Sequence, residues 1–136
     1  MTDEIPDTED AARTWARAAL PTFGGRVFFG FPAGTPALPL LTVARVSGST
    51  DPGPAIDYPR LTWSVWGQNK KDAADGMRAL VAGLRGINSS GGVALNPVTW
   101  CYQVEDIFTV WLPDDDAKLA RYVVDATMVV RVHVAA

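Results

Sequence analysis

The sequence contains very few of the residues that metalloproteins and nucleophilic enzymes depend on. Its 136 residues include one cysteine, Cys101, and one histidine, His133. A single cysteine excludes an intrachain disulfide and a zinc site built on several cysteines. Nothing in the sequence places a nucleophile near His133, so we expect no Ser-His-Asp or Cys-His arrangement. We predict a protein that is not an enzyme, with no catalytic, cofactor-binding or metal-binding residues and no cofactor.

Three other clusters could suggest ligand chemistry, but simpler explanations cover them. Asp114–Asp116 follows a proline, where aspartate is a common turn former, although such a cluster could also attract a hard cation. The glycine pairs Gly24-Gly25 and Gly91-Gly92 lack the Walker and dinucleotide-binding patterns. Glu105 and Asp106 are adjacent, and adjacent strand residues point to opposite faces rather than forming a carboxylate pair.

Charge and hydropathy are those of an ordinary soluble protein. Hydrophobic residues make up 48% and charged residues 20% of the chain, the net charge is −3 and the pI is near 5.0. Specific nucleic-acid binding would need a basic face, which this balance disfavours. The acidic start MTDEIPDTED shows no signal peptide, and no apolar run approaches the ~20 residues that cross a bilayer. We therefore predict one soluble, cytosolic domain over residues 1–136 with no membrane segment.

The first third of the chain predicts a helix followed by two short strands. Asp7 or Thr8 is a suitable N-cap for a helix in the region 1–20, with Glu9 and Asp10 favourable in its first turn. An aromatic strand is expected over 26–31 and a proline-rich connector over 32–39. The strand expected over 40–46 begins after prolines, which would suit a sheet edge.

The centre of the chain carries its clearest pattern, a strand that passes almost directly into a helix. In Arg60–Trp66, alternation places Leu61, Trp63 and Val65 on one face and Trp66 on the other. Asn69 is a good N-cap for an amphipathic helix with one buried stripe, and Gly86 is a suitable end for it.

Two segments flank this unit as breaks in regular structure. Residues 47–59 contain turn-forming residues throughout, and a connection of about a dozen residues is long for a compact domain. We predict a flexible loop there, which could be a spacer or a partner-binding element. A second, shorter break is expected over 88–92.

The last third predicts a long β-hairpin over 93–134. Two strand-like runs, VTWCYQV and IFTVWL, are separated by Glu105-Asp106, where a bulge or tight bend would explain the interrupted alternation. A turn follows at 113–116, and the final strand alternates over 119–134. The elements together predict an α+β fold: a mostly antiparallel sheet with an N-terminal helix and a central amphipathic helix packed on it, plus the long hairpin.

The strand-then-helix unit and the final strand resemble a known viral family. Pro59–Gly67, the helix Asp72–Gly86 and the closing strand Arg121–Val132 are similar to the tail-terminator, or tail-completion, proteins of bacteriophages with long non-contractile tails. This resemblance implies a hexameric ring that caps the tail tube, ends its polymerisation and joins the tail to the head connector. It also implies a virion protein of the tail neck, assembled in the host cytoplasm, with DNA passing through the lumen without specific binding.

Under this resemblance the candidate functional residues are interface residues. Surplus tryptophans would supply exposed apolar surface for ring closure, the final strand carries two arginines, and the 47–59 loop is the candidate for contact with the tail-tube protein. The candidates are Trp66, Trp111, Arg121, Arg131, Asp51, Ile56 and Tyr58. Two alternatives stay open: another neck protein or the tail-tube subunit itself, and, from a different class, a small ligand-binding domain or enzyme using a tryptophan-lined sheet.

Overall fold

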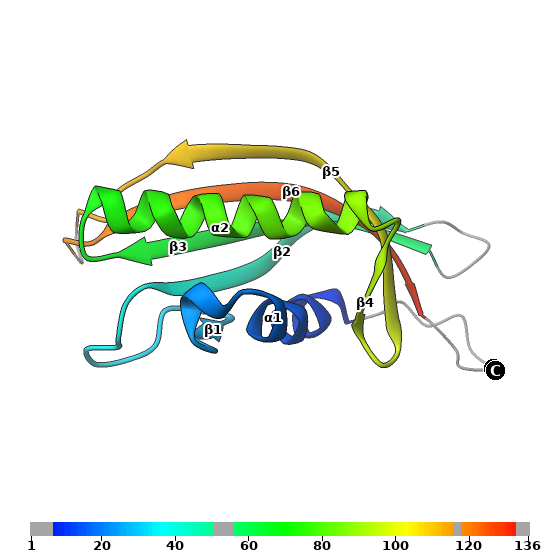
Figure 1. Ribbon diagram of the computed structural model, residues 1–136, viewed down its shortest axis with the longest axis horizontal. Helices are drawn as coiled ribbons and strands as arrows, with labels where there is room; N and C mark the ends of the chain where they lie inside the picture. The colour runs from blue at the N-terminus through cyan, green and yellow to red at the C-terminus, as the bar shows by residue number, and fades with distance from the viewer. Residues whose placement is uncertain (1–6, 51–55, 116–117, 133–136) are drawn as a thin grey trace.

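Six strands form one sheet in the computed structural model, which describes residues 7–50, 56–115 and 118–132 (Figure 1). The strands are β1 (Val27–Phe28), β2 (Leu40–Thr50), β3 (Ile56–Gly67), β4 (Val93–Asn96), β5 (Thr99–Trp111) and β6 (Ala120–Val132). Their order is β1-β2-β3-β6-β5-β4, and every neighbouring pair is antiparallel except β1 and β2. The predicted α+β fold with a mostly antiparallel sheet is confirmed.

Both predicted helices form, and both begin at the predicted caps. The Asp7 side chain accepts a hydrogen bond from Asp10 N (3.1 Å) at the start of α1 (Thr8–Ala19), which a short 3₁₀ turn, η1 (Pro21–Phe23), follows. Asn69 accepts from Asp72 N (2.9 Å) at the start of α2 (Lys70–Ser89). Side-chain acceptors at these positions satisfy amides that have no partner inside the helix.

The end of α2 lies one turn beyond the predicted glycine. Gly86 stays helical and the helix runs to Ser89 because Ile87 extends the apolar stripe into the core. The left-handed residues are Gly91 (φ 80°) and Gly92 (φ 111°), whose amides bond to Asn88 O and Ile87 O. These later glycines end the helix in the way expected of Gly86.

The two helices cover one face of the sheet, and the core lies between them and the strands. α2 packs along β3, β5 and β6, while α1 contacts β1, β2 and β4 (Figure 1). Leu61, Trp63 and Val65 are buried on this face as predicted, and the Trp15 and Trp63 rings meet edge to face at 6.1 Å. From β6, Val124, Ala126, Met128 and Val130 complete the core, and Cys101 is buried among them, as predicted.

The loop predicted over 47–59 is mostly a paired hairpin. Ser47 to Thr50 pair with Arg60 to Asp57, so only the tip between Thr50 and Ile56 lies outside the described residues. Gly48 adopts φ +133° opposite Pro59, where a Cβ would collide with the Tyr58 carbonyl. The prediction placed the strand ends wrongly because it took glycine and proline here as turn residues. In the structure Gly48 and Pro59 lie within the paired strands, where glycine allows the two backbones to approach closely beside a bulge.

The first strands also differ from the prediction. Only Val27 and Phe28 of the 26–31 segment form a strand, and this strand pairs in parallel with Leu41 and Thr42 of β2. The prolines had suggested that the 40–46 strand begins at the edge of the sheet. In the structure β1 lies outside the beginning of β2, so this expectation is wrong.

The C-terminal hairpin is confirmed as β5 and β6, preceded by the separate short strand β4. Register shifts between Cys101 and Gln103 and between Glu105 and Phe108 interrupt the β5–β6 ladder. Asp106 has φ 54°, so a bulge lies at the predicted Glu105-Asp106 pair. Residues 133 and 134 of the predicted hairpin, with His133, lie outside the described residues.

Candidate assembly surfaces

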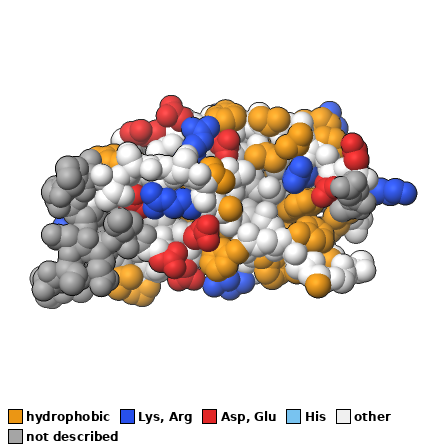
Figure 2. All heavy atoms as spheres, turned by 180° about the vertical axis from the view of Figure 1, so that it is seen from behind, with side chains coloured by type: hydrophobic (Ala, Val, Ile, Leu, Met, Phe, Trp, Pro, Cys, Tyr) orange, Lys and Arg blue, Asp and Glu red, His pale blue; other side chains and the backbone are white. Residues whose placement is uncertain are grey.

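The sheet face opposite the helices has no helix on it in the part of the chain that the structure describes. Figure 2 shows this side with hydrophobic side chains interspersed with charged ones. Phe108 and Val110 of β5 lie here, opposite Asp125 and Val123 of β6, and are 44% and 42% exposed. We call this surface the open face.

Polar contacts on the open face are made within the chain. Asp125 accepts a hydrogen bond from Thr62 Oγ1 (2.5 Å) and forms an ion pair with Arg60 Nη2 (3.5 Å). The Arg60 guanidinium also lies 5.2 Å from the centre of the Phe108 ring. These contacts link β3, β6 and β5 across the open face and hold the cation beside an aromatic ring.

Trp66 lies on the open-face side, as predicted, but its side chain is covered. The Phe31 ring meets it edge to face at 4.7 Å, and the Arg121 guanidinium lies 5.0 Å above it. Its Nε1 donates to Thr42 Oγ1 at 3.4 Å, and only 5% of the residue is exposed. The expectation that Trp66 is a surplus exposed tryptophan is therefore wrong; Phe31, which is exposed, is the residue that presents apolar surface here.

Trp111 is half-buried and lies on the helix side of the sheet. Its ring contacts Tyr122, with ring centres 5.0 Å apart, and Lys70 Nζ at the start of α2 lies 4.9 Å from its centre. Trp111 and Trp66 thus lie on opposite sides of the sheet, at the same end of the strands.

Of the other predicted interface residues, Arg121 lies over Trp66, whereas Ile56, Tyr58 and Arg131 lie at the far end of β3 and β6. Ile56 pairs with Arg131, whose Nη1 donates to the Tyr102 hydroxyl at 3.2 Å. Tyr58 is half-buried beside them on β3, while Asp51 lies outside the described residues. The structure thus separates the predicted interface residues into two groups, about 30 Å apart at ~3.3 Å per residue along the strand.

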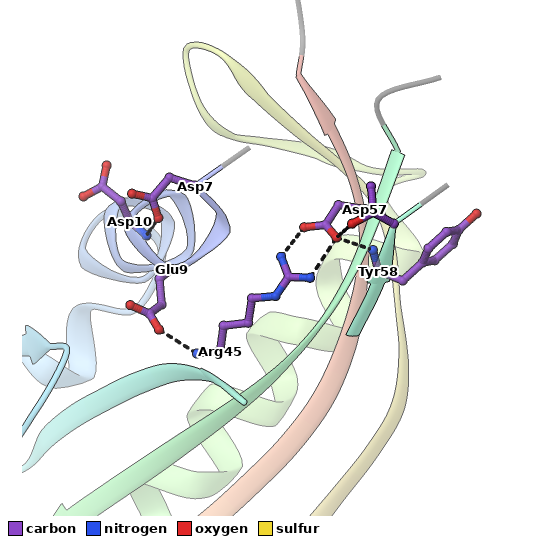
Figure 3. Close-up of polar contacts among 7 residues, drawn as sticks. Asp7, Glu9, Asp10, Arg45, Asp57 and Tyr58 are labelled. Atoms are coloured by element: carbon purple, nitrogen blue, oxygen red, sulfur yellow. Dashed lines mark hydrogen bonds and ion pairs between the residues drawn. The ribbon is translucent and has the colours of Figure 1, made fainter. Parts of the chain in front are cut away.

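An ion pair that the sequence did not predict holds the base of the β2–β3 hairpin (Figure 3). Asp57 is fully buried. Both terminal nitrogens of Arg45 donate hydrogen bonds to its carboxylate, with Nη2 2.9 Å from Oδ1. Thr50 Oγ1 (3.0 Å) and Tyr58 N (3.1 Å) also donate to Oδ1. The Arg45 amide donates to Glu9 Oε2 at 2.8 Å, so the same residue ties the hairpin to α1.

A signal for this contact does exist in the sequence. Asp57 falls in phase with Leu61, Trp63 and Val65, so alternation extended backward would have placed it on the buried face. A buried carboxylate needs a partner, which would have pointed to a nearby cation.

The outer edge of β5 is covered at only one end. β4 pairs with Thr99–Cys101, and the Asn88 side chain bonds both Val104 O (2.9 Å) and Val104 N (2.8 Å). No described strand pairs with the outer side of 105–111. A groove of about 420 Å³ runs beside this edge, lined by Met77, Arg78, Val81, Ala82 and Arg85 of α2 and by Thr109.

Several other features of the described residues bear on ligand binding and thiol chemistry. A second cavity, of about 270 Å³, is lined by Phe31, Gly34, Thr35, Pro36, Leu38 and Leu119, without an ionisable side chain. Among the described residues, no three of His, Cys, Asp and Glu gather as metal ligands. Burial raises the pKa of the Cys101 thiol to about 12, which disfavours a thiolate. No helix in the described ranges is long and apolar enough to cross a membrane.

Comparisons with known proteins identify the fold but not a family. No protein-family profile matches the sequence, and no curated protein matches it. Among solved structures, the chain is similar to a chain in the structure described as the virion of a native gene transfer agent particle, with a TM-score of 0.60 and 16% identity. The alignment covers 90% of this chain and 93% of the other. The two chains share one fold over nearly their full lengths.

Proposed function

We propose that this chain is a structural protein of a phage-like virion. The observation that carries the proposal is the likeness, over 90% of the chain, to a chain in the virion of a gene transfer agent particle. The open face, with its exposed Phe108 and Val110, is the kind of surface that assembly would cover.

Within the virion we propose the role of tail terminator: a hexameric ring in the neck that caps the tail tube and meets the head connector. Support comes from two different surfaces on opposite edges of the sheet, the β5 edge and the side formed by α1 and β2. A closed ring uses a head-to-tail contact between unlike surfaces of each subunit. The rigid body would be the core between the sheet and the two helices.

The β2–β3 hairpin is the proposed contact with the tail-tube protein. Its base is held by the buried Arg45–Asp57 pair and by Glu9, so the direction in which it leaves the domain is set by the core. A preorganised projection loses less conformational freedom on binding than a mobile loop would. Ile56 and Tyr58 lie at this end of the domain and are retained as candidate contacts.

DNA would pass the ring without binding to it. The net charge is −3, and the arginines of the open face are engaged within the chain: Arg60 with Asp125, Arg121 with Leu112 O (2.8 Å) and Arg131 with Tyr102. Cations held by internal partners are less free to replace the counterions of a phosphate backbone.

Electron microscopy of particles from a strain that lacks this gene tests the proposal. Overlong tails without heads are expected, because nothing would end tube polymerisation. Tails of normal length joined to heads would refute the terminator role. Complementation with the unaltered gene should restore normal particles.

The second candidate is the tail-tube subunit or another neck protein, since a free strand edge and an open sheet face also suit a polymerising tube. Quantitative mass spectrometry of purified particles separates the two. A terminator is present as one ring per particle, whereas a tube subunit is present in many stacked rings and polymerises on its own when purified.

A further inference from the structure

The outer edge of β5 from Glu105 to Trp111 has no described strand beside it, and the bulge at Asp106 interrupts only its first part. At ~3.3 Å per residue these seven residues present about 23 Å of strand edge. Soluble proteins usually protect such edges with proline, charged residues, a bulge or a covering element, and here none of these lies between Phe108 and Trp111. Here the charges are confined to Glu105 and Asp106, the rest reads Ile-Phe-Thr-Val-Trp, and no described strand lies alongside.

The groove beside this edge is apolar at its floor and basic at its rim. Met77, Val81 and Ala82 of α2 face Thr109 across it, and Arg78 and Arg85 border it. Arg85 has no ion pair among the described residues. A partner that pairs with the β5 edge would therefore place its own helix-side residues next to two arginines.

Toward the other lateral edge of the same sheet, part of β2 is also uncovered and could pair with the β5 edge. β1 covers only Leu41 and Thr42 of β2, and the Arg45 amide is held by Glu9. Beyond it, Val46–Thr50 is exposed, with Val46 57% exposed. These residues have no strand on their outer side in the part of the chain that is described.

Strand direction and charge both fit a second copy of this chain. Three antiparallel pairings separate β2 from β5, so the two strands run in opposite directions. A neighbour in the same orientation would present β2 to β5 as an antiparallel partner. Within one sheet Ser47 is level with Glu105, and Ala44 is level with Phe108. The neighbour must therefore also be displaced along the strands by about four residues, roughly 13 Å, for 46–50 to meet 105–111. Asp7 and Glu9 at the start of α1 lie on the same sheet face as Arg85 of α2, and none of the three has an ion pair among the described residues, whereas Asp10 pairs with Arg13 and Arg78 with Asp75. Pairing would bring these opposite charges together.

We propose that the β5 edge, residues 105–111, is the subunit–subunit interface and that it receives the β2 edge, residues 46–50, of a second copy. Joining two unlike edges gives a head-to-tail contact, which forms a ring when the rotation between neighbours closes and an open filament when it does not. The inference rests on the proposed ring and adds to it which two surfaces meet.

Lysine substitutions at the two edges test the interface in the purified full-length protein. Val110→Lys and Val46→Lys alter exposed side chains, and lysine on a strand edge opposes pairing. Each should raise the concentration at which oligomers form by about tenfold or more in mass photometry and sedimentation. Val98→Lys, at an exposed turn residue between β4 and β5, is the matched control and should assemble like the unaltered chain.

Cross-linking locates the contact directly. Val110→Cys and Ser47→Cys, which both lie on the open face, are combined in a Cys101→Ala background and treated with a short bismaleimide, which tolerates a shift of one residue in register. The double variant should give a ladder of covalent oligomers, and each single variant should give none beyond a dimer. The proposal is overturned if the double variant gives no ladder.

The outcomes separate this inference from the proposed function. Rings that form equally well with Val110→Lys and Val46→Lys would refute the interface and leave the terminator role standing. Normal tails in the strain lacking the gene, together with a cross-linked ladder, would refute the terminator role and leave the interface standing.

Discussion

Arg45 and Asp57 face each other across the β2–β3 hairpin, and the arginine binds the fully buried carboxylate with both terminal nitrogens. The pair lies where the hairpin leaves the core, and the Arg45 backbone is held by Glu9 of α1. It thus links the first helix, strands β2 and β3 and the proposed tube-binding end through polar contacts.

Removing the cation of this pair should destabilise the protein strongly. Arg45→Met leaves Asp57 buried without its charge partner, and we expect a loss of about 3 kcal/mol in the free energy of unfolding. Arg78→Met is the control, because its pair with Asp75 is exposed to solvent and should contribute little to stability. Urea unfolding of both variants measures the difference.

The double variant Arg45→Met, Asp57→Leu sharpens this test. Replacing both charges by apolar side chains removes the unpaired buried carboxylate, so part of the lost stability should return. Equal losses for Arg45→Met and Arg78→Met would show that the buried pair has no special role in stability.

Two glycines of α2 should respond to alanine in opposite directions. A Cβ at Gly76 would lie 2.7 Å from Val65 Cγ1 and 3.3 Å from Phe23 Cε1, so Gly76→Ala should cost about 1–3 kcal/mol. Gly86 has open space around it and helical backbone, so Gly86→Ala should stabilise by about 0.5–1 kcal/mol. Thermal unfolding followed by circular dichroism compares them; a destabilised Gly86→Ala would contradict the extended helix.

Stability should fall in alkaline solution partly through Cys101. Burial raises its pKa from 9.0 to about 12, so the folded chain keeps a proton that the unfolded chain releases. This contribution is present below pH 9.0 and is lost as the pH rises toward 12. Between these two pH values, this one group should raise the unfolding equilibrium constant by about tenfold per pH unit.

Cys101→Ala removes this contribution and should flatten the alkaline slope. Thiol modification gives an independent readout: the native protein should react very slowly at pH 8, and the urea-unfolded protein quickly. Rapid reaction of the folded protein would show that the thiol is not held in the core.

Asn88 should act as a cap on the edge of β5. Its side chain makes two hydrogen bonds to the backbone of Val104, which is buried, so Asn88→Ala should cost about 1–3 kcal/mol. Faster hydrogen exchange of the Val104 amide should accompany the loss. Ser89→Ala, at an exposed neighbour, should change stability by about 0.5 kcal/mol or less.

Local patterns predicted most of the fold because they depend on residues close in sequence. The caps Asp7 and Asn69, the alternation of Leu61, Trp63 and Val65, and the bulge at Glu105-Asp106 could each be read from a few neighbouring positions. The end of α2 was missed because Ile87, which holds the extra turn, does so through a contact with the core and not through its neighbours in sequence.

The interface residues show the opposite dependence. Whether Trp66 is exposed depends on Phe31 and Arg121, which lie 35 and 55 positions away in the chain. The roles proposed for Trp111, Arg121, Arg131, Ile56 and Tyr58 stay predictions, since they depend on contacts with partners.

Composition and periodicity were enough to establish an acidic α+β chain with one buried cysteine, two capped helices and a long final hairpin. These properties follow from which side chains each short segment can bury. Tertiary structure alone decided that Asp57 meets Arg45, that Trp66 is covered and that the β5 edge is left open. Each of these depends on which strands lie side by side, and strand order is a property of the whole chain.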